Sequence, residues 1–269
     1  MKNRCYLFIA IILICFSSIS NAEQIRYNGS STILKAIMYN LSSVFEKETG
    51  ITFDLKGKST EFGLQKLLSG ECDIAGGGRS LKSEEKDKGL NDVKICIDAY
   101  VFIVNSSNPI QEISSSQIFE ILNGKLSSWD AIDSNIAKKI VVISPPLESA
   151  HYETAKKFIG FEKLPANSMI ADMTPNVLDK VKLFPTAIGW ISYANVKNKK
   201  DVKILNIIHN GERVMLNQAN IQTIKYPYQM SMFFYTKGSP SGGTKKLIDF
   251  IFSDKGKSII QQAGFFPVE

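Results

Sequence analysis

The sequence is poor in the residues on which most catalytic and metal sites depend. Its 269 residues include only two histidines, His151 and His209, and four cysteines. No cysteine and histidine spacing typical of a zinc site occurs, and no G-x-S-x-G nucleophile motif is present. Two histidines also leave no plausible Ser-His-Asp grouping. We therefore expect a protein that is not an enzyme and that holds no metal and no cofactor.

Long apolar runs are also scarce, and the longest lies at the N-terminus. Basic residues at Lys2 and Arg4 precede an apolar run over 6–16, and small polar residues follow up to Ala22. This order is typical of a signal peptide, and the run is too short for a comfortable membrane span. We predict a signal peptide over 1–22, cleavage after Ala22 and an exported protein. A lipid on Cys15 is the weaker alternative, because Ile14 is too large for the usual position before a lipidated cysteine.

The formal net charge of +6 comes from lysines that are dispersed along the chain. Dispersed lysines are typical of a solvated surface, so we expect no nucleic-acid partner. Beyond the signal peptide two cysteines remain, Cys72 and Cys96, and both fall in runs that read as buried strands. An exported pair favours a disulfide, whereas buried strands often hold free cysteines. We expect the two in neighbouring strands, and leave the bond open.

Strand, polar turn and helix follow one another at three places in the chain. The turns contain Ser31 with Thr32, Ser59 with Thr60, and Ser149 with His151. A helix N-terminus carries unpaired N–H groups and partial positive charge, so hydroxyls beside it form a cradle for an oxyanion. The alternative is that each serine or threonine is an ordinary helix cap. Because the same arrangement occurs three times, we favour the oxyanion cradle over ordinary helix caps.

A fourth turn follows the short strand over 72–75. Three glycines, ending at Gly78, allow close backbone approach, and Arg79 then offers a planar charged fork that suits phosphate or carboxylate. The alternative for Arg79 is a surface salt bridge with Glu84 or Glu85. If Arg79 binds an anion, Arg79→Ala should weaken binding and leave ligand-free stability unchanged. Strands alternating with helices predict an α/β fold, with ligands beyond the carboxyl ends of the strands.

Several blocks together resemble one known family. They are NGSST over 28–32, GECDIAGGGRSLK over 70–82, NGKLSSWD over 123–130, AIGWISY over 187–193, and most of 226–267. The sequence resembles the phosphate-binding proteins of bacterial ABC importers, within the type II periplasmic binding-protein fold. The resemblance implies two α/β lobes with mostly parallel sheets and a ligand cleft between them. Lobe 1 is then 23–103 plus 229–269, lobe 2 is 104–228, and hinge strands lie near 102–105 and 225–228.

The resemblance also implies a set of ligand-binding residues. They are Ser31, Thr32, the Ile33 backbone, Ser59, Thr60, Gly78, Arg79, Ser149 and His151. The sequence departs from the family where an arginine usually precedes a Ser-Gly-Thr turn, because Ala150 and His151 replace the glycine and threonine and the arginine is missing. His151 is then a replacement donor, strengthened at acid pH, or alternatively a surface residue in the first helical turn.

The implied function is capture of phosphate or a related small oxyanion, by a periplasmic monomer that delivers it to an ABC permease in the inner membrane. The missing arginine keeps a second hypothesis open, in which a divergent binding domain senses a signal or binds a partner without transporting. Trp129, Trp190 and Tyr193 could form an aromatic platform for the ligand. We expect them in the core instead, because Trp190 lies inside an apolar strand.

Overall fold

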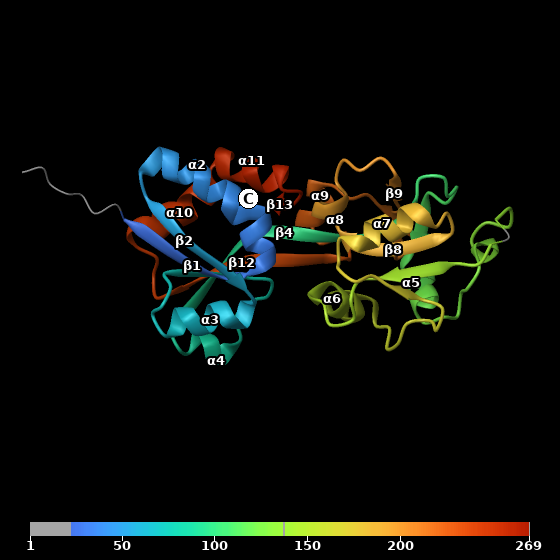
Figure 1. Cartoon of the computed structure of the whole chain (residues 1–269), viewed down its shortest axis with the longest axis horizontal. Helices are drawn as coiled ribbons and strands as arrows, with labels where there is room; N and C mark the ends of the chain where they lie inside the picture. Colours follow the sequence, from blue (N-terminus) through green and yellow to red (C-terminus); the bar gives the residue numbers. More distant parts are fainter. Residues whose placement is uncertain (1–22, 137, 269) are drawn as a thin grey trace, which may run out of the picture.

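The computed structural model describes residues 23–136 and 138–268, so the predicted signal peptide lies outside the described residues. The described chain forms two α/β lobes that lie side by side and are joined by long strands (Figure 1). Within the described part, no helix has the length and apolar character needed to cross a membrane. The α/β class predicted from the sequence is confirmed.

The first lobe combines both ends of the chain. Its elements are β1 (Gln24–Ser30), α1 (Ser31–Ile33), the π-helix η1 (Leu34–Met38), α2 (Tyr39–Thr49), β2 (Thr52–Lys58), α3 (Thr60–Leu68), β3 (Ile74–Gly77), α4 (Ser83–Lys86), β12 (Gln229–Lys237), α10 (Gly242–Phe252), α11 (Asp254–Gln262) and β13 (Phe266–Pro267). β1 pairs in parallel with β2 and β3, so the starts of α1 and α3 lie at the same edge of the sheet.

The second lobe is built from the middle of the chain. Its elements are β5 (Glu112–Ser114), α5 (Ser115–Leu122), the 3-10 helix η2 (Trp129–Ala131), β6 (Val141–Ser144), α6 (Ala150–Ile159), β7 (Met169–Ile170), α7 (Asn176–Leu183), β8 (Ala187–Ser192), α8 (Tyr193–Val196), β9 (Val202–Ile204), β10 (Asn206–His209), β11 (Glu212–Val214) and α9 (Gln218–Gln222). β6 pairs in parallel with β7 and β8, as the alternation of strands and helices predicts.

The strand β4 (Leu90–Asn105) belongs to both lobes. Its residues from Leu90 to Ala99 pair with β12, and those from Tyr100 to Val104 pair with β8. The change of partner therefore falls between Ala99 and Tyr100, a few residues before the predicted crossing near 102–105. All four pairings of β4, with β12, β13, β8 and β9, are antiparallel, so parallel pairing is confined mainly to the outer strands of each lobe. The domain bounds themselves stay a prediction.

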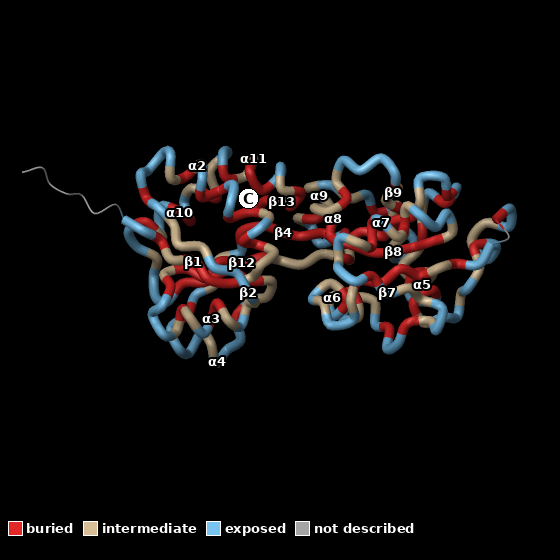
Figure 2. The backbone as a smooth tube through the Cα atoms, viewed as in Figure 1, coloured by how far each residue is buried: buried red, intermediate tan, exposed pale blue. Residues whose placement is uncertain are grey.

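Each lobe has its own apolar core, as the buried segments in Figure 2 show. Trp129 and Trp190 are 0% and 1% exposed and lie in the largest cluster of the second lobe. The Trp129 indole N–H donates a hydrogen bond to the Thr186 carbonyl at 2.9 Å, which satisfies its one polar group. The prediction of core packing is confirmed for both tryptophans, whereas Tyr193 is only partly buried against the same cluster.

The two cysteines do not lie in neighbouring strands, so that prediction is wrong. Cys96 is on β4, whereas Cys72 precedes β3, and β12 lies between β3 and β4 in the sheet. Both thiols are buried and free. The sequence pattern did not reveal that β12, which comes late in the chain, inserts between β3 and β4.

We therefore predict that a chain beginning at Glu23 reacts with two equivalents of thiol reagent after denaturation without reductant. Burial raises the pKa of the Cys72 thiol to about 11 and that of Cys96 above its ordinary value, so both should react slowly in the folded protein. Mass spectrometry after alkylation in denaturant measures the count. A single species lacking both labels would demonstrate a disulfide and contradict the arrangement.

Gly63 brings α3 unusually close to β1. A Cβ atom at this position would lie 2.8 Å from the Gly29 Cα atom and 2.9 Å from the Asn28 carbonyl oxygen. Since backbone atoms on a sheet cannot move aside cheaply, this contact requires glycine within a helix. This close packing fixes the distance between α3 and β1, and so the position of the start of α3 at the edge of the sheet.

We predict that Gly63→Ala destabilises the protein by about 1–3 kcal/mol through steric overlap. Helix propensity alone predicts a gain of about 1 kcal/mol in the opposite direction. Urea unfolding measures the change, with Gln65→Ala as the control because Gln65 is exposed on the same helix. A stabilised Gly63→Ala variant would show that the helix can shift away from the strand.

Candidate functional site

The first strand–turn–helix unit starts the helix with Ser30 as its cap. The Thr32 N–H group donates to the Ser30 hydroxyl oxygen at 3.2 Å, and the Ser31 hydroxyl donates to the Lys58 carbonyl at 3.1 Å. Ser31 is therefore used largely within the lobe, whereas Thr32 lines the space between the lobes. The Ile33 side chain is fully buried in the core, so any contact with a ligand would come from its backbone.

The second unit combines the start of α3 with the glycine turn after β3. The Ser59 hydroxyl accepts from the Phe62 N–H group at 3.1 Å as an ordinary cap. The Thr60 hydroxyl oxygen accepts from the Gly78 N–H group at 3.3 Å, so its own proton can be donated elsewhere. A Cβ atom at Gly77 would lie 2.4 Å from the Thr60 methyl group, which explains why this turn needs glycine. Thr60 and Gly78 thus form the part of the first lobe that borders the space between the lobes.

The third unit lies at the start of α6 in the second lobe. Ser149 caps this helix by accepting from the Tyr152 N–H group at 3.2 Å. Ala150 and His151, on the first turn, face the first lobe across the gap and line the same cavity as Thr32. The three helix starts therefore face a common space, although the serine caps themselves are occupied by backbone N–H groups.

That space is a cavity of ≈ 400 Å³ between the lobes. It brings together five of the predicted residues, namely Thr32, Thr60, Gly78, Arg79 and His151. Other lining residues were not predicted; they are Ser30, Glu61, Asp98, Tyr100, Ala150, Glu153, Thr154, Met230 and Met232. A second cavity of ≈ 430 Å³ shares Thr32 and His151 with it and adds Ser31 and Lys35. The predicted Ser59, Ser149 and Ile33 support these walls without lining them.

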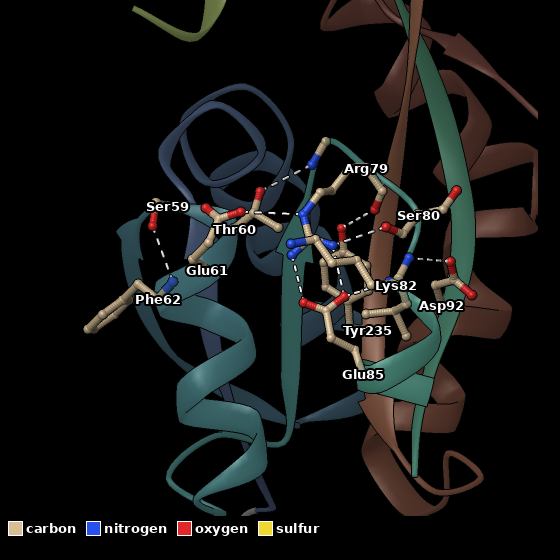
Figure 3. Close-up of polar contacts among 12 residues, drawn as sticks. Ser59, Thr60, Glu61, Phe62, Arg79, Ser80, Lys82, Glu85, Asp92 and Tyr235 are labelled. Atoms are coloured by element: carbon tan, nitrogen blue, oxygen red, sulfur yellow. Dashed lines mark hydrogen bonds and ion pairs between the residues drawn. The ribbon is translucent and has the colours of Figure 1, made fainter. Parts of the chain in front are cut away.

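Arg79 lies on the cavity wall, and its guanidinium group is held by carboxylates (Figure 3). Its two terminal nitrogens lie 2.8 and 2.7 Å from the two Glu85 carboxylate oxygens, and its Nε atom lies 3.3 Å from Glu61. The hydrogen bonds from Arg79 lower the pKa of Glu85 to about 2. The structure therefore contains the salt bridge with Glu85 that the sequence offered as the alternative to anion binding by Arg79. A role in ligand binding stays a prediction that requires a ligand to compete with Glu85.

His151 is not a surface residue, so that alternative is wrong. Its Nε2 atom is buried without a hydrogen-bond partner, and its ring lies 5.4 Å from the Tyr100 ring. Burial lowers the pKa of His151 to about 4. The imidazole is therefore neutral at ordinary pH, and the predicted strengthening at mildly acid pH does not apply. A neutral imidazole can still donate one hydrogen bond into the cavity.

Asp98 is the main lining residue that the sequence reasoning missed. It is 0% exposed, and its Oδ1 atom accepts from the Ser192 hydroxyl at 2.5 Å, while Oδ2 has no partner. Burial raises the pKa of Asp98 to about 7. The signal was available, because an aspartate inside the apolar run KICIDAYVFIV must face something polar.

Among the described residues, no group of three or more histidine, cysteine, aspartate or glutamate side chains is placed to hold a metal ion. The polar groups that line the cavity are hydroxyls, backbone N–H groups, one neutral imidazole, carboxylates and the Arg79 guanidinium, which is paired with carboxylates. Groups of these kinds can bind and orient a polar molecule. Together, the two-lobed fold and the cavity between its lobes are those of a solute-binding protein.

Comparison with known proteins identifies the family. The model of the PBP superfamily domain matches residues 17–255, so the chain belongs to this superfamily. The phosphate-binding protein PstS of Borreliella burgdorferi is 25% identical over 259 residues, covering 92% of this chain and 91% of that protein. PstS of Bacillus subtilis is 25% identical over 250 residues, covering 91% of this chain and 81% of that protein.

Solved structures agree with the fold. A Clostridium perfringens substrate-binding protein with bound phosphate, assigned to a phosphate ABC transporter, superposes with a TM-score of 0.73 at 25% identity and covers 92% of this chain and 100% of that one. An ABC-type phosphate transport receptor from Vibrio cholerae gives a TM-score of 0.76 at 20% identity, covering 91% of this chain and 100% of that one. The latter supports the fold alone.

Because Glu85 holds Arg79, we no longer expect unchanged ligand-free stability. We predict that Arg79→Ala lowers the free energy of unfolding at pH 7 by about 1–3 kcal/mol, because Glu85 then loses its half-buried partner. The pKa of Glu85 is depressed in the folded state, so this stabilisation is complete above about pH 4.5 and disappears as the pH falls towards about 2. Urea unfolding between pH 3 and pH 7 measures it. Glu120→Gln, on an exposed helix position of the second lobe, is the control. Equal stability of Arg79→Ala and wild type at pH 7 would mean that the ion pair contributes nothing.

Proposed function

We propose that this chain is an exported solute-binding protein that captures phosphate or a related small oxyanion and delivers it to an ABC permease. It is not an enzyme; it acts outside the inner membrane after removal of its signal peptide, and as a monomer. One observation carries the proposal. Three helix starts and a glycine turn, from both lobes, border a single cavity with hydroxyl and backbone N–H donors.

The donors suit a tetrahedral oxyanion. Thr32 and Thr60 offer hydroxyl groups from the first lobe, and the neutral His151 ring offers one N–H group from the second. Because the donors lie on separate lobes, a bound anion would bridge them and favour closure. Sequence similarity to phosphate-binding proteins from several bacteria supports the same ligand class.

Asp98 completes the proposed site as an acceptor. Inorganic phosphate near neutral pH carries at least one hydroxyl group, which can donate to the unpartnered Asp98 Oδ2 atom. With a pKa of about 7, Asp98 can also carry a proton and donate to an anionic oxygen. A ligand oxygen of either kind therefore finds a partner at the floor of the cavity.

We predict that inorganic phosphate at a hundredfold excess over its dissociation constant stabilises the protein by roughly 2.7 kcal/mol. Thr32→Val keeps the shape of the side chain and removes its hydroxyl group, so affinity should fall by about fivefold to twentyfold. Thermal unfolding with and without phosphate measures the stabilisation, and isothermal titration calorimetry measures the affinities of the wild-type chain and of Thr32→Val.

The control is Thr52→Val, because Thr52 is exposed at the start of β2, at the opposite end of the sheet from the cavity. Thr52→Val should bind as wild type does. Absence of any stabilisation by phosphate, sulfate or other small oxyanions would contradict the proposal and favour the sensory or partner-binding alternative.

A further inference from the structure

The cavity between the lobes carries more negative than positive side chains. Glu61, Asp98 and Glu153 line it, and Arg79 is the one lysine or arginine among its described lining residues. Arg79 is already paired with Glu85 and Glu61, as Figure 3 shows. A ligand that carries only negative charge would therefore meet uncompensated carboxylates.

Two of the three lining carboxylates have no cationic partner among the described residues. Glu61, at the start of α3 beside Thr60, pairs with Arg79, whereas no salt bridge engages Asp98 on β4 or Glu153 on α6 of the second lobe. The hydroxyl groups of Thr32 and Thr60, by contrast, can donate to an anionic group from the first lobe. The cavity therefore suits a ligand with an anionic end and a cationic end.

Asp98 gives the independent indication of a ligand. Its Oδ2 atom is fully buried, has no protein partner and belongs to a side chain that lines the cavity. The groups around Asp98 are Tyr100 on the same strand, Ser192 on β8 and, across the cavity, His151 and Glu153 on α6. None of these is a cation, because burial keeps His151 neutral. A buried carboxyl group without a partner either keeps a proton or needs a donor or cation to satisfy its charge, and a bound cation would take the place of that proton.

We propose that the cavity binds a zwitterionic oxyanion, an aminoalkyl phosphonate or a phosphate monoester of an amino alcohol, with its ammonium group held by Asp98 and Glu153. This inference rests on the proposed oxyanion-binding function and specifies the ligand class. The anionic group occupies the helix starts beside Thr32 and Thr60. The volume of ≈ 400 Å³ falls in the range of sites for small organic ligands.

The test compares 2-aminoethylphosphonate with ethylphosphonate, which has the same anionic group and chain without the amine. Calorimetric titration of the wild-type chain should give at least about tenfold tighter binding of the aminated ligand. Inorganic phosphate is titrated in parallel, so that oxyanion binding itself is measured.

Two variants locate the effect. Glu153→Gln, at an exposed position that will not disturb folding, should reduce the ratio of the two affinities to about threefold or less, and Asp98→Asn should do the same. Glu162→Gln makes the same charge change at an exposed position of the second lobe outside the cavity, and should keep the wild-type ratio.

The outcomes separate the two proposals. Equal affinities for the two phosphonates, with inorganic phosphate bound, would overturn the zwitterion inference and leave the oxyanion function intact. A preference for the amine that persists unchanged in both Glu153→Gln and Asp98→Asn would also overturn it. If no phosphonate and no phosphate binds, both the inference and the proposed function fail.

Discussion

The continuity of β4 is the constraint on which the rest of the structure depends. One strand of sixteen residues hydrogen-bonds to β12 in the first lobe and to β8 in the second. Because the pairing changes between Ala99 and Tyr100, the residues on either side of that point lie at the floor of the space between the lobes. Asp98 and Tyr100 are placed there by backbone hydrogen bonds rather than by loops, so their positions are firmly fixed.

The pairing of charged side chains around the cavity restricts which ligands can bind there. The Arg79 guanidinium is the strongest anion-binding group that the sequence offers at this site, yet it is held in a bidentate pair with Glu85. A ligand must therefore either compete for Arg79 or bind through hydroxyl and N–H donors alone. The buried carboxyl of Asp98 favours ligands that bring a proton or a positive charge to it. In the proposed site, acceptors therefore restrict the choice of ligand as much as donors do.

The fold was predictable from the sequence because its signals are local. Apolar periodicity, glycine stops and serine caps predicted the parallel α/β units, and the apolar context of Trp190 predicted its burial. The insertion of β12 between β3 and β4 depends on contacts between distant segments, so neighbouring strands for Cys72 and Cys96 were wrongly predicted. For the salt bridge of Arg79, the sequence suggested Glu84 or Glu85, because both lie close to Arg79 in the chain. The structure shows the pair with Glu85. The burial of the His151 Nε2 atom depends on packing against residues distant in the sequence, such as Tyr100, which periodicity does not reveal.

The insertion of β12 also determines the order in which the lobes can be completed. The second lobe is encoded by one continuous segment, whereas β3 and β4 have no strand between them until residues 229–237 are available. During synthesis or passage through a translocation channel, the first lobe therefore presents two open strand edges for most of that time. Unpaired strand edges are templates for aggregation. A chaperone that keeps the exported chain unfolded until its C-terminus arrives would protect this lobe in particular.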